Sequence, residues 1–169
     1  HADIFPDVQA IKTQFHHLMR TVPSSGLAVV NGGDAHLKET LAMGCWTPVE
    51  TFADGDWRAH YLQADGSEFQ VFFKEQAQGM VRWELLGEHN VNNALAAIAA
   101  ARHAGVPVAH AVEALAEFKG VKRRMQLRGV VRDVAVYDDF AHHPTAITTT
   151  LAGLRAKVGA ARIIALLEP

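Results

Sequence analysis

Hydrophobic positions that recur every three or four residues predict most of the helices in this chain. Val8, Ile11, Phe15 and Leu18 follow this spacing, and they indicate an amphipathic helix that Pro23 and Gly26 bring to an end. Val108, Val112 and Leu115 repeat the pattern further along. The helices predicted from such spacing and from capping signals cover residues 7–21, 34–43, 90–104 and 106–118, with another beginning near Thr145.

Short alternating runs separated by Asp-Gly turns predict an antiparallel meander between residues 49 and 86. We interpret this stretch as a small β subdomain inserted into an α/β core, with Trp46, Trp57 and Trp83 as its packing anchors. Strands are also predicted at 26–31, 125–131 and 134–137, and a buried parallel strand at 162–169.

Composition narrows the class of protein. The chain has 169 residues, of which 49% are hydrophobic, so it is large enough for a substantial core. A net charge of −2 gives no electrostatic reason to expect nucleic-acid binding. Cys45 is the single cysteine, which favours a reducing compartment, and no segment has the pattern of a membrane span or signal peptide. We therefore expect a cytoplasmic protein without a membrane or nucleic-acid partner. Both ends have the pattern of a cut chain.

The stretch from residue 85 to 105 carries the first candidate chemistry. It contains His89, Asn90 and Asn93, and then a run of small residues that favours a helix other elements can approach closely. Asn90 suits a helix N-cap, which would place Asn93 one turn further on the same face. Two amides on one face could instead bind the edge of a purine. The residues alone leave both interpretations open.

Two later clusters allow the same kind of choice. Lys122, Arg123 and Arg124 form either a solvated rim or a clamp for an anion. Residues 137–144, Tyr-Asp-Asp-Phe-Ala-His-His-Pro, place two carboxylates and two imidazoles after a strand, where α/β proteins hold ligands. The alternative is a polar turn in which an aspartate binds loop amides. A zinc site of His1, Asp3, His142 and His143 is disfavoured, because adjacent residues lack chelate spacing.

Three ordered motifs together resemble the Mur ligase family, the ATP-dependent amide-forming enzymes of peptidoglycan synthesis. They are Gly-Glu-His-Asn-x-x-Asn-Ala from residue 87, Arg-Arg at 123–124, and Asp-Asp-Phe-Ala-His-His-Pro from residue 138. The resemblance covers essentially the whole chain. It implies the distal half of a central ATPase domain with an antiparallel β insertion over residues 1–122, followed by the start of a Rossmann-like C-terminal domain over residues 123–169.

The resemblance also implies roles for particular residues on the N-terminal side. Asn90 and Asn93 match asparagines that bind adenine, and His89 belongs to the same nucleotide-binding motif. His1 matches a histidine that ligates a magnesium ion. The implied cofactors are thus ATP and Mg²⁺.

On the C-terminal side, Arg124 matches an arginine of the interdomain loop that reaches the ATP phosphates. Asp139 matches a carboxylate that contacts the ribose. His142 lies next to the nucleotide, and Phe140 stands where related enzymes often have tyrosine. Arg124 and His142 are therefore the expected catalytic residues.

Within the family, the segments at 41–46 and 165–169 resemble the branch that acts in peptidoglycan recycling. That branch joins the tripeptide L-alanyl-γ-D-glutamyl-meso-diaminopimelate to UDP-N-acetylmuramate. Phe15, at the place of a carbamylated lysine in other branches, argues against folylpolyglutamate synthetase and fits this branch or the one that adds L-alanine. The Gly-x-x-Gly-Lys-Thr phosphate loop is absent, so the chain alone is expected to be inactive. A non-catalytic interaction domain is the other alternative.

Overall fold

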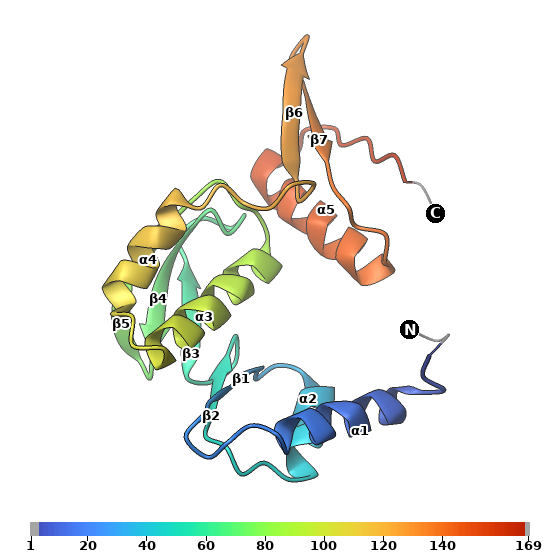
Figure 1. Ribbon diagram of the computed structural model, residues 1–169. Coiled ribbons are helices and arrows are strands. Elements are labelled where there is room, and N and C mark those ends of the chain that lie inside the picture. Colours follow the sequence, from blue (N-terminus) through green and yellow to red (C-terminus); the bar gives the residue numbers. More distant parts are fainter. Residues whose placement is uncertain (1–3, 168–169) are drawn as a thin grey trace.

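The computed structural model describes residues 4–167 as two successive α/β units (Figure 1). The N-terminal unit carries a sheet with four helices, and the C-terminal unit carries a hairpin with one helix. The helices are α1 (Val8–Met19), α2 (Ala35–Ala42), α3 (Glu88–His103), α4 (Val108–Glu117) and α5 (Pro144–Val158). The strands are β1 (Ala28–Asn31), β2 (Val49–Phe52), β3 (Trp57–Tyr61), β4 (Glu68–Phe73), β5 (Gln76–Arg82), β6 (Gln126–Val131) and β7 (Val134–Asp138).

The first five strands form one sheet in the order β1-β2-β3-β4-β5. Strands β3, β4 and β5 pair antiparallel, which confirms the predicted meander. The run at 49–52 behaves differently, because β2 pairs in parallel with β1 over four residues and meets β3 only at Phe52 and Trp57. The meander therefore continues the sheet of the α/β core, and β2 is not its first strand.

One face of the meander and the helix α3 enclose the hydrophobic core. Val91, Leu95 and Ile98 recur at helical spacing on α3 and are fully buried against Phe69 and Val81 of the sheet. Helix α4 adds Val112 to the same cluster, as its predicted apolar face requires. Alanines on α3 let the sheet approach closely, so the helix and the meander pack as one body.

Two of the three predicted tryptophan anchors are confirmed. Trp57 is fully buried, with its ring 4.4 Å from that of Phe73, and Trp83 packs edge-on against Phe69 at 5.5 Å. Trp46 is 67% exposed, so its prediction as an anchor was wrong. It follows α2 in a loop outside the meander, and its ring lies over Gly44, where a side chain would leave no room.

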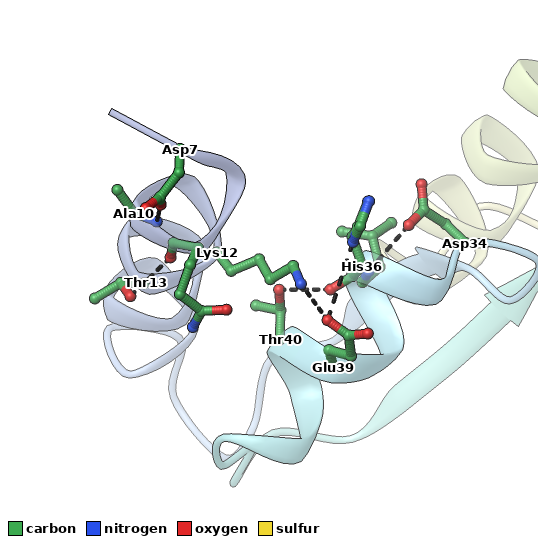
Figure 2. Close-up of polar contacts among 10 residues, drawn as sticks. Asp7, Ala10, Lys12, Thr13, Asp34, His36, Glu39 and Thr40 are labelled. Atoms are coloured by element: carbon green, nitrogen blue, oxygen red, sulfur yellow. Dashed lines mark hydrogen bonds and ion pairs between the residues drawn. The ribbon is translucent and has the colours of Figure 1, made fainter. Parts of the chain in front are cut away.

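Helices α1 and α2 pack against each other, and both start where the sequence predicts (Figure 2). The Asp7 carboxylate accepts a hydrogen bond from the Ala10 N–H at 2.7 Å, and the Asp34 carboxylate accepts one from Leu37 at 3.0 Å. Lys12 of α1 forms an ion pair with Glu39 of α2, and this contact lowers the pKa of the Glu39 carboxyl.

The C-terminal unit contains the predicted strand pair and helix. Arg132 and Asp133 both have positive φ, 48° and 62°, which suits a two-residue turn that follows the strand twist. The prediction of a buried strand at 162–169 was wrong for the part described. Residues 162–167 form no strand, and Leu166 is 93% exposed, because β6 and β7 pair only with each other and no described strand lies beside this segment. No described helix is long and apolar enough to span a membrane.

Candidate functional site

The start of α3 places the first motif. Gly87 occupies the N-cap position with φ 88°, so the prediction of Asn90 as N-cap was wrong. Glycine adopts this backbone conformation readily, and the helix therefore begins before Asn90. The Asn90 side chain instead donates from Nδ2 to the Leu86 carbonyl at 2.8 Å. This bond fixes the amide and leaves its oxygen and second N–H for another partner.

Asn93 lies on the next turn of α3 and is exposed. Residues three apart on a helix are surface neighbours, so the two amides lie on one side of α3. Within residues 4–167 the Asn93 side chain makes no hydrogen bond. The Asn90 amide is therefore held in one orientation, and the Asn93 amide is available to bind a ligand.

Asp139 follows β7, and its carboxylate joins the loop before β6 to the loop before α5 through hydrogen bonds. Its Oδ2 accepts from the Met125 N–H at 2.8 Å, and its Oδ1 accepts from the Ala141 N–H at 2.7 Å. This is the arrangement that a polar turn predicts. A carboxylate has about four lone-pair positions, so two remain for a ligand hydroxyl.

The two arginines of the connecting loop have different surroundings. Arg123 has φ 59°, and its carbonyl accepts from the Phe140 N–H at 2.9 Å. Its guanidinium lies 5.1 Å above the Phe140 ring and 3.6 Å from an Asp138 oxygen. Arg124 is exposed, and its side chain forms no hydrogen bond or ion pair with any residue the structure describes. Arg123 is thus fixed within the C-terminal unit, whereas Arg124 is free to bind an anion.

His89 connects the first motif to the other two. Burial lowers the pKa of its imidazole, the Asp139 carboxylate opposes this by raising the pKa, and the Arg124 guanidinium lowers it further. The pKa of His89 therefore depends on one charged residue from each of the two later motifs. Its Nδ1 is buried, with no hydrogen-bond partner in the described chain. A buried nitrogen without a partner is costly to the stability of the fold, and its burial leaves no surface through which a ligand atom could reach it.

His142 and Phe140 lie together on the loop before α5. Their rings meet edge to face at 5.0 Å, and His142 Nδ1 lies 2.9 Å from the Phe140 carbonyl oxygen. If Nδ1 donates this bond, Nε2 is left as an acceptor. Both side chains are exposed, so they form an aromatic surface beside Arg123.

Each metal prediction includes residues that the structure does not describe. His1 and Asp3 lie outside residues 4–167. Among the described residues, no group of three histidine, cysteine or acidic side chains gathers in a way that could hold an ion.

The residue that sequence reasoning missed is Gly153. It lies inside α5, yet it is buried against Gly87 at the start of α3. The signal available in the sequence is a glycine in a helical segment, where it is less favourable than alanine.

Comparisons with known proteins match both units of the chain. Residues 1–101 match the Mur ligase middle domain, and residues 123–168 match the glutamate ligase domain of Mur ligases. Over its whole length the chain is 54% identical to the UDP-N-acetylmuramate–L-alanyl-γ-D-glutamyl-meso-2,6-diaminoheptandioate ligase of Escherichia coli K12, covering 37% of that protein. It is 35% identical to the UDP-N-acetylmuramate–L-alanine ligase of Dictyoglomus turgidum, over 92% of this chain and 34% of that one.

A solved structure shares the fold as well as the sequence. The murein peptide ligase of Psychrobacter arcticus is 49% identical, with a TM-score of 0.70 over 92% of this chain and 34% of that one. The chain thus spans a little over a third of the length of the curated relatives it matches. Because a family domain matches residues 1–101 and a second matches 123–168, the chain belongs to the Mur ligase family.

Proposed function

We propose that this chain is part of an ATP-dependent ligase that joins L-alanyl-γ-D-glutamyl-meso-diaminopimelate to UDP-N-acetylmuramate in peptidoglycan recycling. The observation that carries the proposal is the identity over the whole chain, 54% with the tripeptide ligase of E. coli against 35% with an alanine ligase. In the proposed reaction, ATP phosphorylates the muramoyl carboxylate. The tripeptide amine then attacks the acyl phosphate, and phosphate leaves.

The nucleotide would bind between the start of α3 and the loops of the C-terminal unit. Asn90 and Asn93 would bind the adenine edge, because the first is oriented by Leu86 and the second is available. His89 would lie next to the base. Asp139 would accept a ribose hydroxyl with the lone pairs that its two backbone contacts leave.

The phosphates would be bound by Arg124, whose planar fork of donors suits phosphate oxygens. His142 and Phe140 would form the neighbouring wall of the nucleotide site. The domain boundary would lie between residues 122 and 123, where the connection has left-handed backbone at Gly120, Arg123 and Met125. Magnesium is expected with ATP, and His1 is its proposed ligand. The described residues include no cluster to hold it, so we assign the ion no step.

The cytoplasm is the proposed location, as the lone Cys45 suggests. A chimera tests the function directly. The residues of the E. coli ligase that match this chain would be replaced by the chain itself, and ADP release would be measured with UDP-N-acetylmuramate and either the tripeptide or L-alanine. Release that depends on the tripeptide supports the proposal. Release with L-alanine alone would assign the chain to the alanine branch, and a folded chimera without either activity would contradict the function.

A further inference from the structure

Three glycines are packed in a row at the boundary of the two units, with Gly87 between the other two. Gly66 belongs to the turn between β3 and β4, Gly87 precedes α3, and Gly153 lies inside α5. Figure 1 shows α5 beside the start of α3, and the helices α3 and α5 are in contact. We propose that these residues form a glycine pivot, a contact without side chains that sets how closely the C-terminal unit approaches α3.

The lower part of the pivot is fixed to the sheet. The Gly87 N–H donates to the Asp65 carbonyl at 2.7 Å, and the Trp83 Nε1–H donates to the Gly66 carbonyl at 2.9 Å. A Cβ added at Gly66 would lie 3.1 Å from Val91 Cγ2 and 3.4 Å from the Gly87 carbonyl oxygen. The turn at Gly66 therefore supports Gly87 directly, and Gly87 has little room to move toward the sheet.

The upper part of the pivot is Gly153. A Cβ added there would lie 2.9 Å from the Gly87 Cα and 3.0 Å from the Gly87 nitrogen. Carbon atoms in contact are normally 3.5–4.0 Å apart, so a methyl group at 153 must move one unit away from the other by about 1 Å. The obstructing atoms are backbone atoms and cannot rotate aside. Since alanine favours a helix more than glycine does, Gly153 serves the contact and not the stability of α5.

The glycine pivot is next to the candidate site residues, which come from both units. His89 and Asn90 are two and three residues from Gly87 on the N-terminal unit, while Arg124 and Asp139 belong to the C-terminal unit. The charges of Arg124 and Asp139 both affect the pKa of His89. A displacement of α5 therefore changes the separation of the two halves of the site, which makes Gly153 a positioning residue.

Spin-label distances test the pivot without any assumption about activity. Labels would be placed on the exposed positions Ala100 of α3 and Lys157 of α5 through Ala100→Cys and Lys157→Cys, in a Cys45→Ser background. The chain with glycine at 153 should give one narrow distance distribution. Gly153→Ala should displace or broaden it, and Gly153→Leu should do so more strongly, although both residues favour helix. Gly129→Ala is the matched control, because its added Cβ meets nothing within 4 Å.

Two results would overturn the pivot. One is a broad spin-label distance distribution in the chain that keeps Gly153. This measurement does not depend on whether a chain with a substitution at 153 folds. The other is a Gly153→Leu distribution that matches the original.

A second measurement rests on the proposed function and uses the chimera. Gly153→Ala should lower kcat on the order of tenfold, with the KM for UDP-N-acetylmuramate unchanged. A change confined to that KM would contradict the positioning role. If the unsubstituted chimera is inactive, the proposed function fails, but the spin-label distances still decide the pivot.

Discussion

At the scale of single residues, Arg123 and Arg124 differ in the contacts that their side chains make. Arg123 is bound by Phe140 and Asp138, whereas Arg124 has no partner among the described residues. In the chimera, Arg124→Lys would keep the charge but lose the proposed bidentate contact with the ATP phosphates, which would be worth roughly 1.5–3 kcal/mol, so turnover should fall about tenfold to a hundredfold. Steady-state kinetics with the tripeptide measure this, and Arg123→Lys is the control. Normal turnover of Arg124→Lys beside a crippled Arg123→Lys would reverse the assignment.

His89 gives a prediction about pH at the same scale. Because burial is the main cause of its lowered pKa, the unfolded chain binds a proton at higher pH than the folded chain does. The stability that His89 contributes is complete above the unfolded value of about 6.5 and is lost as the pH falls through the folded value. His89→Gln should therefore flatten the fall in unfolding free energy between pH 7 and pH 5. Urea titrations at several pH values test this, and an unchanged slope would contradict it.

At the scale of elements, Glu50 ties β2 to β3 and α3. Its side chain is 15% exposed and accepts from Trp57 Nε1 at 2.7 Å and from Arg102 at 2.8 Å. Glu50→Ala would leave the buried indole N–H without a partner, so we expect a loss of about 2–3 kcal/mol in urea unfolding. Glu75, 78% exposed in its pair with Arg58, supplies the control, since Glu75→Ala should cost under about 1 kcal/mol. Equal losses would contradict the claim that the buried indole N–H of Trp57 depends on Glu50.

Local chemistry explains which elements could be predicted. Asp7 and Asp34 bind backbone N–H groups three residues ahead, so their helix starts can be read from neighbouring residues. The alternation in β3, β4 and β5 likewise reflects one buried face. The partner of β2 could not be predicted, because alternation does not say whether a strand pairs with the next strand or with β1. The strand expected after residue 161 is wrong for a different reason, because no described strand lies beside residues 162–167.

The site shows the same limit. Arg124 and Asp139 both influence the pKa of His89, so these three residues lie near one another, and their roles toward a nucleotide stay a prediction. The cap interpretation of Asn90 is wrong because Gly87 takes the N-cap position, with a backbone conformation that the neighbouring residues do not predict. Gly153 was missed because its contact lies 66 positions away in sequence, and only the packed structure reveals it.

At the scale of the whole molecule, the absence of a phosphate loop leads to a simple prediction. The 169-residue chain alone should show no ATP-dependent ligation and at best weak nucleotide binding, because it lacks the Gly-x-x-Gly-Lys-Thr sequence that binds phosphates. ADP release and calorimetric titration with ATP measure the two quantities. Sustained turnover with UDP-N-acetylmuramate and tripeptide, from a preparation of verified length, would refute this expectation.

The pairing of the sheet also bears on the order in which the chain folds. Strands β3, β4 and β5 join neighbours along the chain, with Tyr61 opposite Phe69 and Phe73 opposite Gln76, so closing these loops loses little entropy. The parallel pair β1–β2 must first enclose α2, since Ala28 lies opposite Val49. The meander should thus form in the folding nucleus, and β1 should dock after the rate-limiting step. A destabilising change such as Val29→Ala would then accelerate unfolding and leave the folding rate nearly unaltered.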